Sequence, residues 1–281
     1  MSMTVRPSPL AGTWYPADPK VLAMWIDRLL LEARKDLPPI DPARVIALIA
    51  PHAGLRYSGP VAARAYAVVA GRSYERVAVV GPMHHLVNAP LLTTAYDAWE
   101  TPLGLVPVDH ATLRQLDEAL RARGLPGLRR LLNDPEHSLE MEVIFLQRAL
   151  QGTFHLLPLM LATVDPTILQ GLGEALAEHI APGADLMVAS SDLSHYYPQK
   201  LANALDAEML RRILSLDPMA VLRAEEEGKG FACGRAAIAT ILWASLALGA
   251  TEAVLLGYAT SGDITGDYRQ VVGYPAVAIL R

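Results

Sequence analysis

The chain has 281 residues, which exceeds the roughly 100 to 200 residues of a typical domain, although α/β proteins of about 250 residues often form one domain. We therefore expect a single domain over residues 1–281. Hydrophobic residues make up 52% and charged residues 19% of the chain, which is enough apolar material for a deep core. A net charge of -5, without runs of like charge, argues against nucleic acid as a partner, because binding its phosphates requires a basic surface.

Membrane and secretion signals are not evident. The start of the chain lacks an apolar run of signal-peptide length. The longest uncharged stretch, 236–251, would span about 24 Å as a helix, short of the ~30 Å hydrocarbon core of a bilayer. The one cysteine, Cys233, cannot form a disulfide within the chain. We expect a protein without a membrane partner, located in the reducing cytoplasm.

Two hydrophobic periods alternate along the chain. Segments of helical period are separated by short apolar runs that are typical of buried strands. Strands that are apolar throughout, alternating with amphipathic helices, predict a mostly parallel sheet covered by helices on both faces, a three-layer α/β sandwich. The predicted helices cover 18–35, 58–71, 109–124, 136–150, 165–180, 199–216 and 233–248, and the predicted strands cover 44–51, 76–82, 155–162, 185–191, 253–259 and 274–280.

Polar side chains follow three of the predicted strands. In open parallel sheets, ligands bind at the carboxyl ends of the strands. One strand is followed by His52, the next by His84 and His85, and a third by Asp192 and His195. A lone histidine beside an apolar run is more often structural, but four of the eight histidines cluster at such positions. We therefore predict a ligand site at this edge of the sheet.

Cys233 directly precedes a long apolar helix, and a helix N-terminus lowers the pKa of a thiol. The sequence thus predicts a thiolate that acts as nucleophile or soft metal ligand. Imidazole and thiolate ligands suit zinc, copper or iron, and three protein ligands leave coordination positions open. Asp192 and His195 are then candidates for a catalytic proton-transfer pair or for outer ligands that orient the metal-binding residues.

The roles of three further residues allow two interpretations each. His137 and Glu140 stand three residues apart on a predicted helix and share a face, where they either line the pocket or form a surface ion pair. Arg235 either anchors an anionic substrate or marks a helix start.

Seven short motifs occur in this order along the chain: "APHAGLRYSG", "VVGPMHH", "TPLG", "EHSLE", "SSDLSHY", "ACGR" and "YATSGD". The chain resembles the Memo family, also called AmmeMemoRadiSam system protein B. The resemblance implies a fold similar to that of class III extradiol ring-cleaving dioxygenases. It further implies an iron or copper ion, with zinc possible, held by His52, His84 and Cys233, and a pocket lined by Asp192 and His195. The dioxygenases use a carboxylate as third iron ligand, where this chain offers the cysteine.

Three function hypotheses follow. The first is a metal-dependent oxidoreductase or oxygenase acting on an unknown small molecule. The second is a cysteine hydrolase with Cys233 as nucleophile, His195 as base and Asp192 as orienting group. The third is a binding protein without turnover. The bacterial family name implies association with a radical SAM enzyme and an AMMECR-like protein, and the sequence leaves the oligomeric state open.

Overall fold

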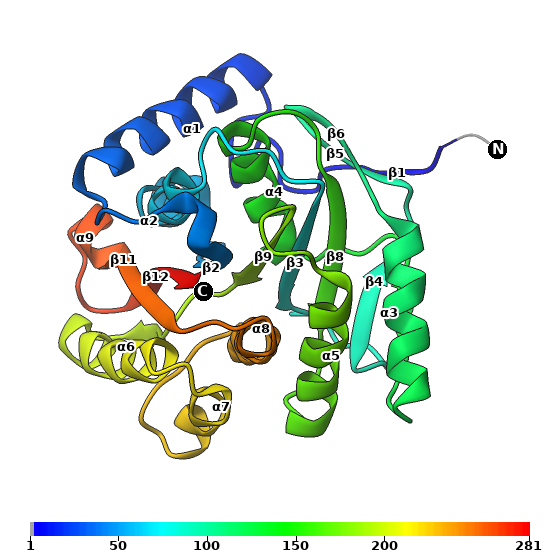
Figure 1. Ribbon diagram of the computed structural model, residues 1–281. Helices are drawn as coiled ribbons and strands as arrows, with labels where there is room; N and C mark the ends of the chain where they lie inside the picture. The colour runs from blue at the N-terminus through cyan, green and yellow to red at the C-terminus, as the bar shows by residue number, and fades with distance from the viewer. Residues whose placement is uncertain (1–2) are drawn as a thin grey trace.

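The computed structural model describes residues 3–281. Within this range, nine strands form one sheet and three form a smaller sheet near the N-terminus (Figure 1). The strands are β1 (Val5–Arg6), β2 (Val45–Ala50), β3 (Arg76–Pro82), β4 (Leu91–Thr94), β5 (Ala98–Thr101), β6 (Gly104–Pro107), β7 (Arg129–Leu131), β8 (His155–Leu161), β9 (Asp185–Ser190), β10 (His195–Tyr197), β11 (Glu252–Thr260) and β12 (Val271–Leu280). The helices are α1 (Pro19–Ala33), α2 (Leu55–Val68), α3 (His110–Ala122), α4 (Ser138–Ala149), α5 (Pro166–His179), α6 (Gln199–Leu214), α7 (Pro218–Glu226), α8 (Arg235–Ala247) and α9 (Ser261–Thr265), with 3-10 turns at Arg34–Asp36 and Pro42–Arg44.

The large sheet is parallel at its centre and antiparallel towards its edges. Its strand order is β10-β12-β2-β9-β3-β8-β4-β7, with β11 pairing β12. Strands β2, β9, β3 and β8 are parallel neighbours. Because β11 and β12 are joined without a long crossover helix, they pair antiparallel. The parallel centre places the carboxyl ends of β2, β9 and β3 side by side, and these ends carry the site.

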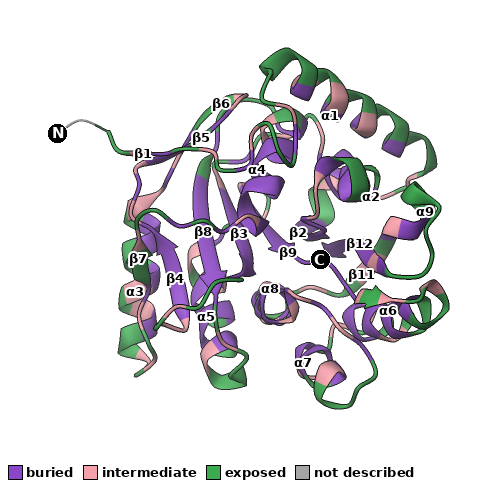
Figure 2. Ribbon diagram, turned by 180° about the vertical axis from the view of Figure 1, so that it is seen from behind, coloured by how far each residue is buried: buried purple, intermediate pink, exposed green. Residues whose placement is uncertain are grey.

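Helices cover both faces of the sheet, so the expected three-layer α/β sandwich is confirmed. Helices α2 and α4 pack on one face with α1 outside them, and α8 packs on the other face with α5 and α7 against it (Figure 1). Figure 2 shows that the sheet strands and the inward sides of these helices are buried, whereas the outer sides of α1, α3 and α5 are exposed. Every residue of β2 and β9 is buried, which explains why these strands read as continuous apolar runs.

The seven predicted helices are all present, with shifts at their ends. Asp18 caps α1 through the N–H groups of Lys20 and Val21, as its position before Pro19 predicts. Helix α2 begins three residues before the predicted start, and α4 begins two residues after it. Within residues 3–281, none of the helices combines the length and apolar character needed to cross a membrane.

Candidate metal centre

Three strand ends meet at one edge of the large sheet. His52 follows β2 by two residues, His84 follows β3 by two residues, and Asp192 follows β9 by two residues. Since β9 lies between β2 and β3, Asp192 lies between the two histidine-bearing segments. The backbone N–H of His52 donates to the Asp192 carboxylate at 2.9 Å, which ties the first two strand ends together.

Cys233 reaches this edge from the loop that precedes α8. Its backbone N–H donates to the carbonyl of Asp192 at 3.2 Å, and the N–H of Asp192 donates to Cys233 Sγ at 3.3 Å. The loop approaches β9 so closely that a Cβ on Gly234 would lie 2.3 Å from the carbonyl oxygen of Ser190. Glycine is therefore required beside the cysteine, and the sulfur is fixed above the end of β9.

The two imidazoles and the sulfur form a compact cluster. Cys233 Sγ lies 3.2 Å from His52 Nε2. One potential ligand atom each from His52, His84 and Cys233 lie within 4.8 Å of one another. Residues that are separated by up to 181 positions in the sequence are thus brought together as the Memo resemblance implies.

Buried partners hold both imidazoles by their Nδ1 atoms. His52 Nδ1 is hydrogen-bonded to Ser190 Oγ at 2.9 Å, and the Ser190 hydroxyl lies 2.6 Å from a carboxyl oxygen of Glu142. His84 Nδ1 is hydrogen-bonded directly to Glu136 at 2.9 Å. Because Nδ1 of each ring is engaged, Nε2 is the atom that each histidine offers for coordination.

The electrostatics favour the neutral forms of His52 and Cys233 when no metal is bound. Burial, together with the neighbouring His137 and His84, lowers the pKa of His52 well below its usual value. Burial also lowers the pKa of His137 to about 4. For Cys233 the expected depression of the thiol pKa is wrong, since burial and the nearby Asp192 raise it despite the start of α8. Neutral imidazoles are ready to ligate, but the thiol needs a cation to favour its ionised form.

Asp192 and His195 lie at the same site without bonding to each other. Burial raises the pKa of Asp192 to about 7, partly offset by hydrogen bonds from the backbone of His52 and Ala53. Burial lowers the pKa of His195. Both side chains line the same cavity, but the hydrogen bonds among residues 3–281 include none between them. The sulfur of Cys233 is paired with His52 rather than with His195.

The remaining predicted residues divide between the site and its surroundings. His137 is close to both cluster histidines, with ring centroids 5.4 Å from His52 and 4.5 Å from His84. His85 is exposed beside His84. Glu140 points elsewhere: it is buried and accepts hydrogen bonds from Arg6 at 2.6 Å and from Ser8 and Tyr15. His137 precedes the first turn of α4, so the helical spacing that was expected to align it with Glu140 does not apply.

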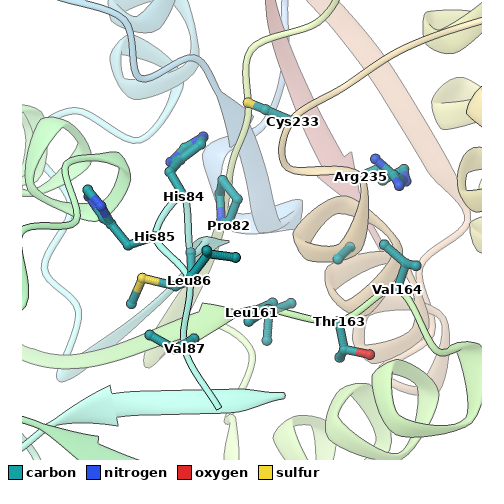
Figure 3. A pocket seen from close by; sticks show the side chains of 13 residues that line it. Pro82, His84, His85, Leu86, Val87, Leu161, Thr163, Val164, Cys233 and Arg235 are labelled. Carbon is teal, nitrogen blue, oxygen red and sulfur yellow. The ribbon is translucent and has the colours of Figure 1, made fainter. Parts of the chain in front are cut away.

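Two cavities open onto the cluster. The larger, of about 710 Å³, is lined by His52, His84, Asp192 and His195 among others. The smaller, of about 390 Å³, is lined by His84, His85, Cys233 and apolar residues of the loops after β3 and β8. Figure 3 shows this smaller cavity, with His84 and Arg235 on opposite sides and Cys233 at the top. Arg235 forms an ion pair with Glu225, so its charge is partly neutralised there.

Several residues of the site were not singled out from the sequence. Glu136 precedes His137 directly in the "EHSLE" motif, and this adjacent carboxylate and imidazole were the available signal. Ser190 and Glu142 lie inside a strand and a helix whose apolar character masked them. The walls of the larger cavity add Trp14, Arg56, Tyr57 and Tyr196, which stand in loops and at element ends where no periodic pattern marks them.

Known proteins resemble this chain over nearly its whole length. The family model described as Memo-like protein matches residues 6–278. A MEMO1 family protein of Methanopyrus kandleri is 35% identical, with 98% of this chain and 99% of the relative covered. MEMO1 family proteins of Methanothermobacter thermautotrophicus, at 36% identity over 96% of this chain and 98% of the relative, and of Aquifex aeolicus, at 31% over 99% and 100%, match similarly. The chain belongs to the Memo-like protein family.

Proposed function

We propose that this protein is a redox metalloprotein, an oxidoreductase or oxygenase in which His52, His84 and Cys233 hold iron or copper. The observation that supports it most is the convergence of one thiol and two imidazoles, from three separate segments, within 4.8 Å. Histidines and a cysteine that serve only in packing are not expected to direct their ligand atoms towards a common point.

The donor set fits a bound transition metal. Metal–sulfur bonds of about 2.3 Å and metal–nitrogen bonds of about 2.0 Å in a tetrahedral site place sulfur and nitrogen about 3.5 Å apart. The 3.2 Å between Cys233 Sγ and His52 Nε2 is close to that separation. Imidazole and thiolate together favour iron, copper or zinc over magnesium or calcium. Three protein ligands leave room for substrate, and the thiolate receives an N–H hydrogen bond from Asp192.

A bound iron or copper ion would supply one-electron chemistry and polarise a coordinated oxygen atom. The chain's own residues supply binding and proton transfer. Asp192 lines the larger cavity, and with its pKa raised to about 7 by burial its carboxylate takes up or returns a proton near neutral pH. His195, neutral because burial lowers its pKa, provides a second proton acceptor in the same cavity.

Zinc remains the alternative occupant, since it accepts the same ligands without redox chemistry. The hydrolase alternative has less support. A cysteine nucleophile needs a depressed pKa, whereas burial raises the pKa of Cys233. The imidazole within hydrogen-bond reach of its sulfur is His52 and not His195, the base that this hypothesis requires.

The partners and location are proposals that rest on the family resemblance and on composition. We expect a small-molecule substrate and association with a radical SAM enzyme and an AMMECR-like protein. A free thiol at the centre of the site favours a reducing compartment such as the cytoplasm. Co-purification from cells that express all three proteins would test the association.

The metal is tested by elemental analysis after anaerobic purification without added metal. We expect iron or copper near one equivalent in the wild type. His52→Ala and Cys233→Ser should each lower metal affinity by at least the roughly 10–100-fold that loss of an outer-shell partner causes. His155→Ala is the matched control, because His155 is exposed at the opposite end of β8. Metal content unchanged in both site variants would contradict the proposal.

A further inference from the structure

The larger cavity has features that the metal ligands do not explain. Its volume of about 710 Å³ is within the roughly 300–1,000 Å³ range of small-molecule sites. His52 and His84 form part of its wall, so a molecule inside it lies against the metal centre. Other residues that line it are aromatic or basic, and they point to the chemistry of the occupant.

The cavity lining includes one permanently charged cation. Arg56 is the only lysine or arginine among the lining residues. It is exposed, and among residues 3–281 no carboxylate forms an ion pair with it, in contrast to Arg235 and its partner Glu225. Its guanidinium lies 5.9 Å from the ring centre of Tyr57. An unpaired guanidinium is a preformed site for a carboxylate, which it binds through two parallel hydrogen bonds.

Three exposed aromatic side chains share this wall: Trp14, Tyr57 and Tyr196. Trp14 packs against His137, with ring centroids 4.6 Å apart, and so connects this wall to the metal cluster. Exposed aromatic side chains that line one cavity mark a binding surface for a flat apolar group.

Tyr196 is held in an unfavourable backbone conformation. Its φ of 63° lies in the left-handed region, where a bulky residue is an outlier. A register shift between His195 and Tyr197, opposite β12, leaves Tyr196 as an extra residue in the strand. Bulges of this kind redirect a side chain and recur next to binding sites. Strain that is retained at a residue lining a cavity indicates a function for the ring it positions.

We propose that this cavity binds a small carboxylate with a flat, unsaturated body, the carboxylate pairing with Arg56 and the body lying against Trp14, Tyr57 and Tyr196. The inference rests on the proposed metal function, which it extends by naming a substrate class. The opposite end of the molecule then faces His52, His84 and Asp192, where the chemistry takes place.

Benzoate is the probe, and its affinity is measured by calorimetry on the iron-loaded protein under anaerobic conditions. Three comparison compounds each lack one feature of benzoate. Benzyl alcohol lacks the negative charge, cyclohexanecarboxylate lacks the flat ring, and acetate lacks any ring. We expect benzoate to bind about tenfold more tightly than each, the difference expected from one charge-assisted pair or one stacked ring. Equal affinity for benzoate and benzyl alcohol would overturn the inference.

Variants assign the binding to the named residues. Arg56→Gln should weaken benzoate about tenfold and leave benzyl alcohol unchanged, and Arg56→Lys should restore part of the loss. Arg28→Gln, which removes an exposed arginine on α1 outside the cavity, is the control. Tyr196→Gly removes the ring and the strain together, so unfolding stability should be maintained while benzoate affinity falls. Benzoate affinity unchanged in Arg56→Gln would contradict the assignment.

The same titrations separate this inference from the metal proposal when they are repeated after chelation, with metal content measured in parallel. One outcome is that the protein takes up no iron or copper but still binds benzoate through Arg56. That outcome would support the carboxylate site and contradict the redox function. A protein that binds metal through His52 and Cys233 but shows no benzoate preference would retain the redox function and reject the carboxylate site.

Discussion

Two buried glutamates six residues apart, Glu136 and Glu142, support the two histidines of the cluster in different ways. Glu136 lies two residues before α4 and accepts N–H hydrogen bonds from the backbone of His84, His137 and Ser138 at 2.6–2.9 Å. Glu142 lies inside α4, where its own backbone neighbours are engaged in the helix, and only side-chain hydroxyl groups reach it.

The two glutamates therefore differ in charge: Glu136 is an anion and Glu142 is a neutral acid at pH 7. Burial alone would raise the pKa of Glu136, but hydrogen bonds from His84 and from backbone N–H groups outweigh it and lower the pKa. Burial raises the pKa of Glu142 to about 8, which the hydroxyl groups of Ser190 and Tyr66 only partly counter. The hydrogen bonds from His84, together with the N–H groups at the start of α4, thus make Glu136 an anion, whereas Glu142 lacks such donors and is a neutral acid.

This difference makes the two proposed histidine ligands unequal. His84 is hydrogen-bonded directly to an anion, which fixes the ring and strengthens its Nε2 as a metal ligand. His52 is hydrogen-bonded to the hydroxyl of Ser190, which connects it to a neutral acid. We therefore expect changes at Glu136 to affect metal binding and stability more than changes at Glu142.

The largest effect is expected for Glu136→Gln. A carboxamide oxygen cannot accept all the N–H groups that the carboxylate accepts, and each donor left unpaired costs about 1–3 kcal/mol. Unfolding free energy from urea titration at pH 7 should fall by roughly 2–5 kcal/mol, and metal affinity by roughly 10–100-fold. Glu118→Gln, on the exposed side of α3, is the control. A loss no greater than the control's would show that the backbone N–H groups do not need the anion.

Glu142→Gln should instead change how stability depends on pH. The folded pKa of about 8 lies above the ordinary value of 4.5, so the protonated acid contributes stability that is fully present below pH 4.5 and is lost as pH rises through 8. Relative to the variant, the metal-free wild type should lose on the order of 1 kcal/mol for each pH unit within this window. Chemical denaturation at pH 5 and pH 8 measures the change, and parallel curves for the two proteins would contradict a neutral Glu142.

Ser190→Ala breaks the link between Glu142 and His52 without touching Glu136. Removal of the hydroxyl leaves His52 Nδ1 without its hydrogen-bond partner, at a cost of about 1–3 kcal/mol. Metal affinity should fall by roughly tenfold, because the ring is no longer held in orientation. Ser194→Ala is the matched control, since among residues 3–281 its buried hydroxyl has no hydrogen-bond partner. Equal metal affinity in the two variants would reject a positioning role for Ser190.

The sequence was sufficient to predict the fold and much of the cluster. Continuous apolar runs marked the strands that are buried on both faces, and ligand types directly after those runs identified His52, His84 and Asp192. These three residues lie together because the strand order is β2-β9-β3. That order is not evident from the sequence, since β2, β3 and β9 are not arranged in the sheet in their chain order. The antiparallel strands β11 and β12 were predicted, whereas β4, β7 and β10 are too short to show the pattern that marks a strand.

The supporting residues could not be predicted for a different reason. The role of a buried carboxylate depends on which donors face it, and those donors arrive from distant segments. Glu136, Glu140 and Glu142 are close in sequence, yet they bond respectively to His84, to Arg6 from the N-terminal segment and to Ser190 of β9. Local spacing suggested only that His137 and Glu140 share a helix face, and the start of α4 at Ser138 removed that basis.

The smallest effect is expected for Tyr66→Phe, which tests the charge of Glu142 from its other side. The Tyr66 hydroxyl donates to Glu142 at 2.5 Å, and its ring stacks on Phe145, a contact that phenylalanine preserves. Loss of a hydrogen bond to a neutral acid costs about 1 kcal/mol, and loss of one to a carboxylate costs about 1.5–3 kcal/mol. The destabilisation should therefore grow from about 1 kcal/mol at pH 5 to about 2 kcal/mol at pH 9, as Glu142 ionises through its pKa of about 8. Urea denaturation of the metal-free protein at both pH values measures it, and a loss that stays constant with pH would mean that Glu142 keeps one charge state and that the contrast with Glu136 is smaller than the structure indicates.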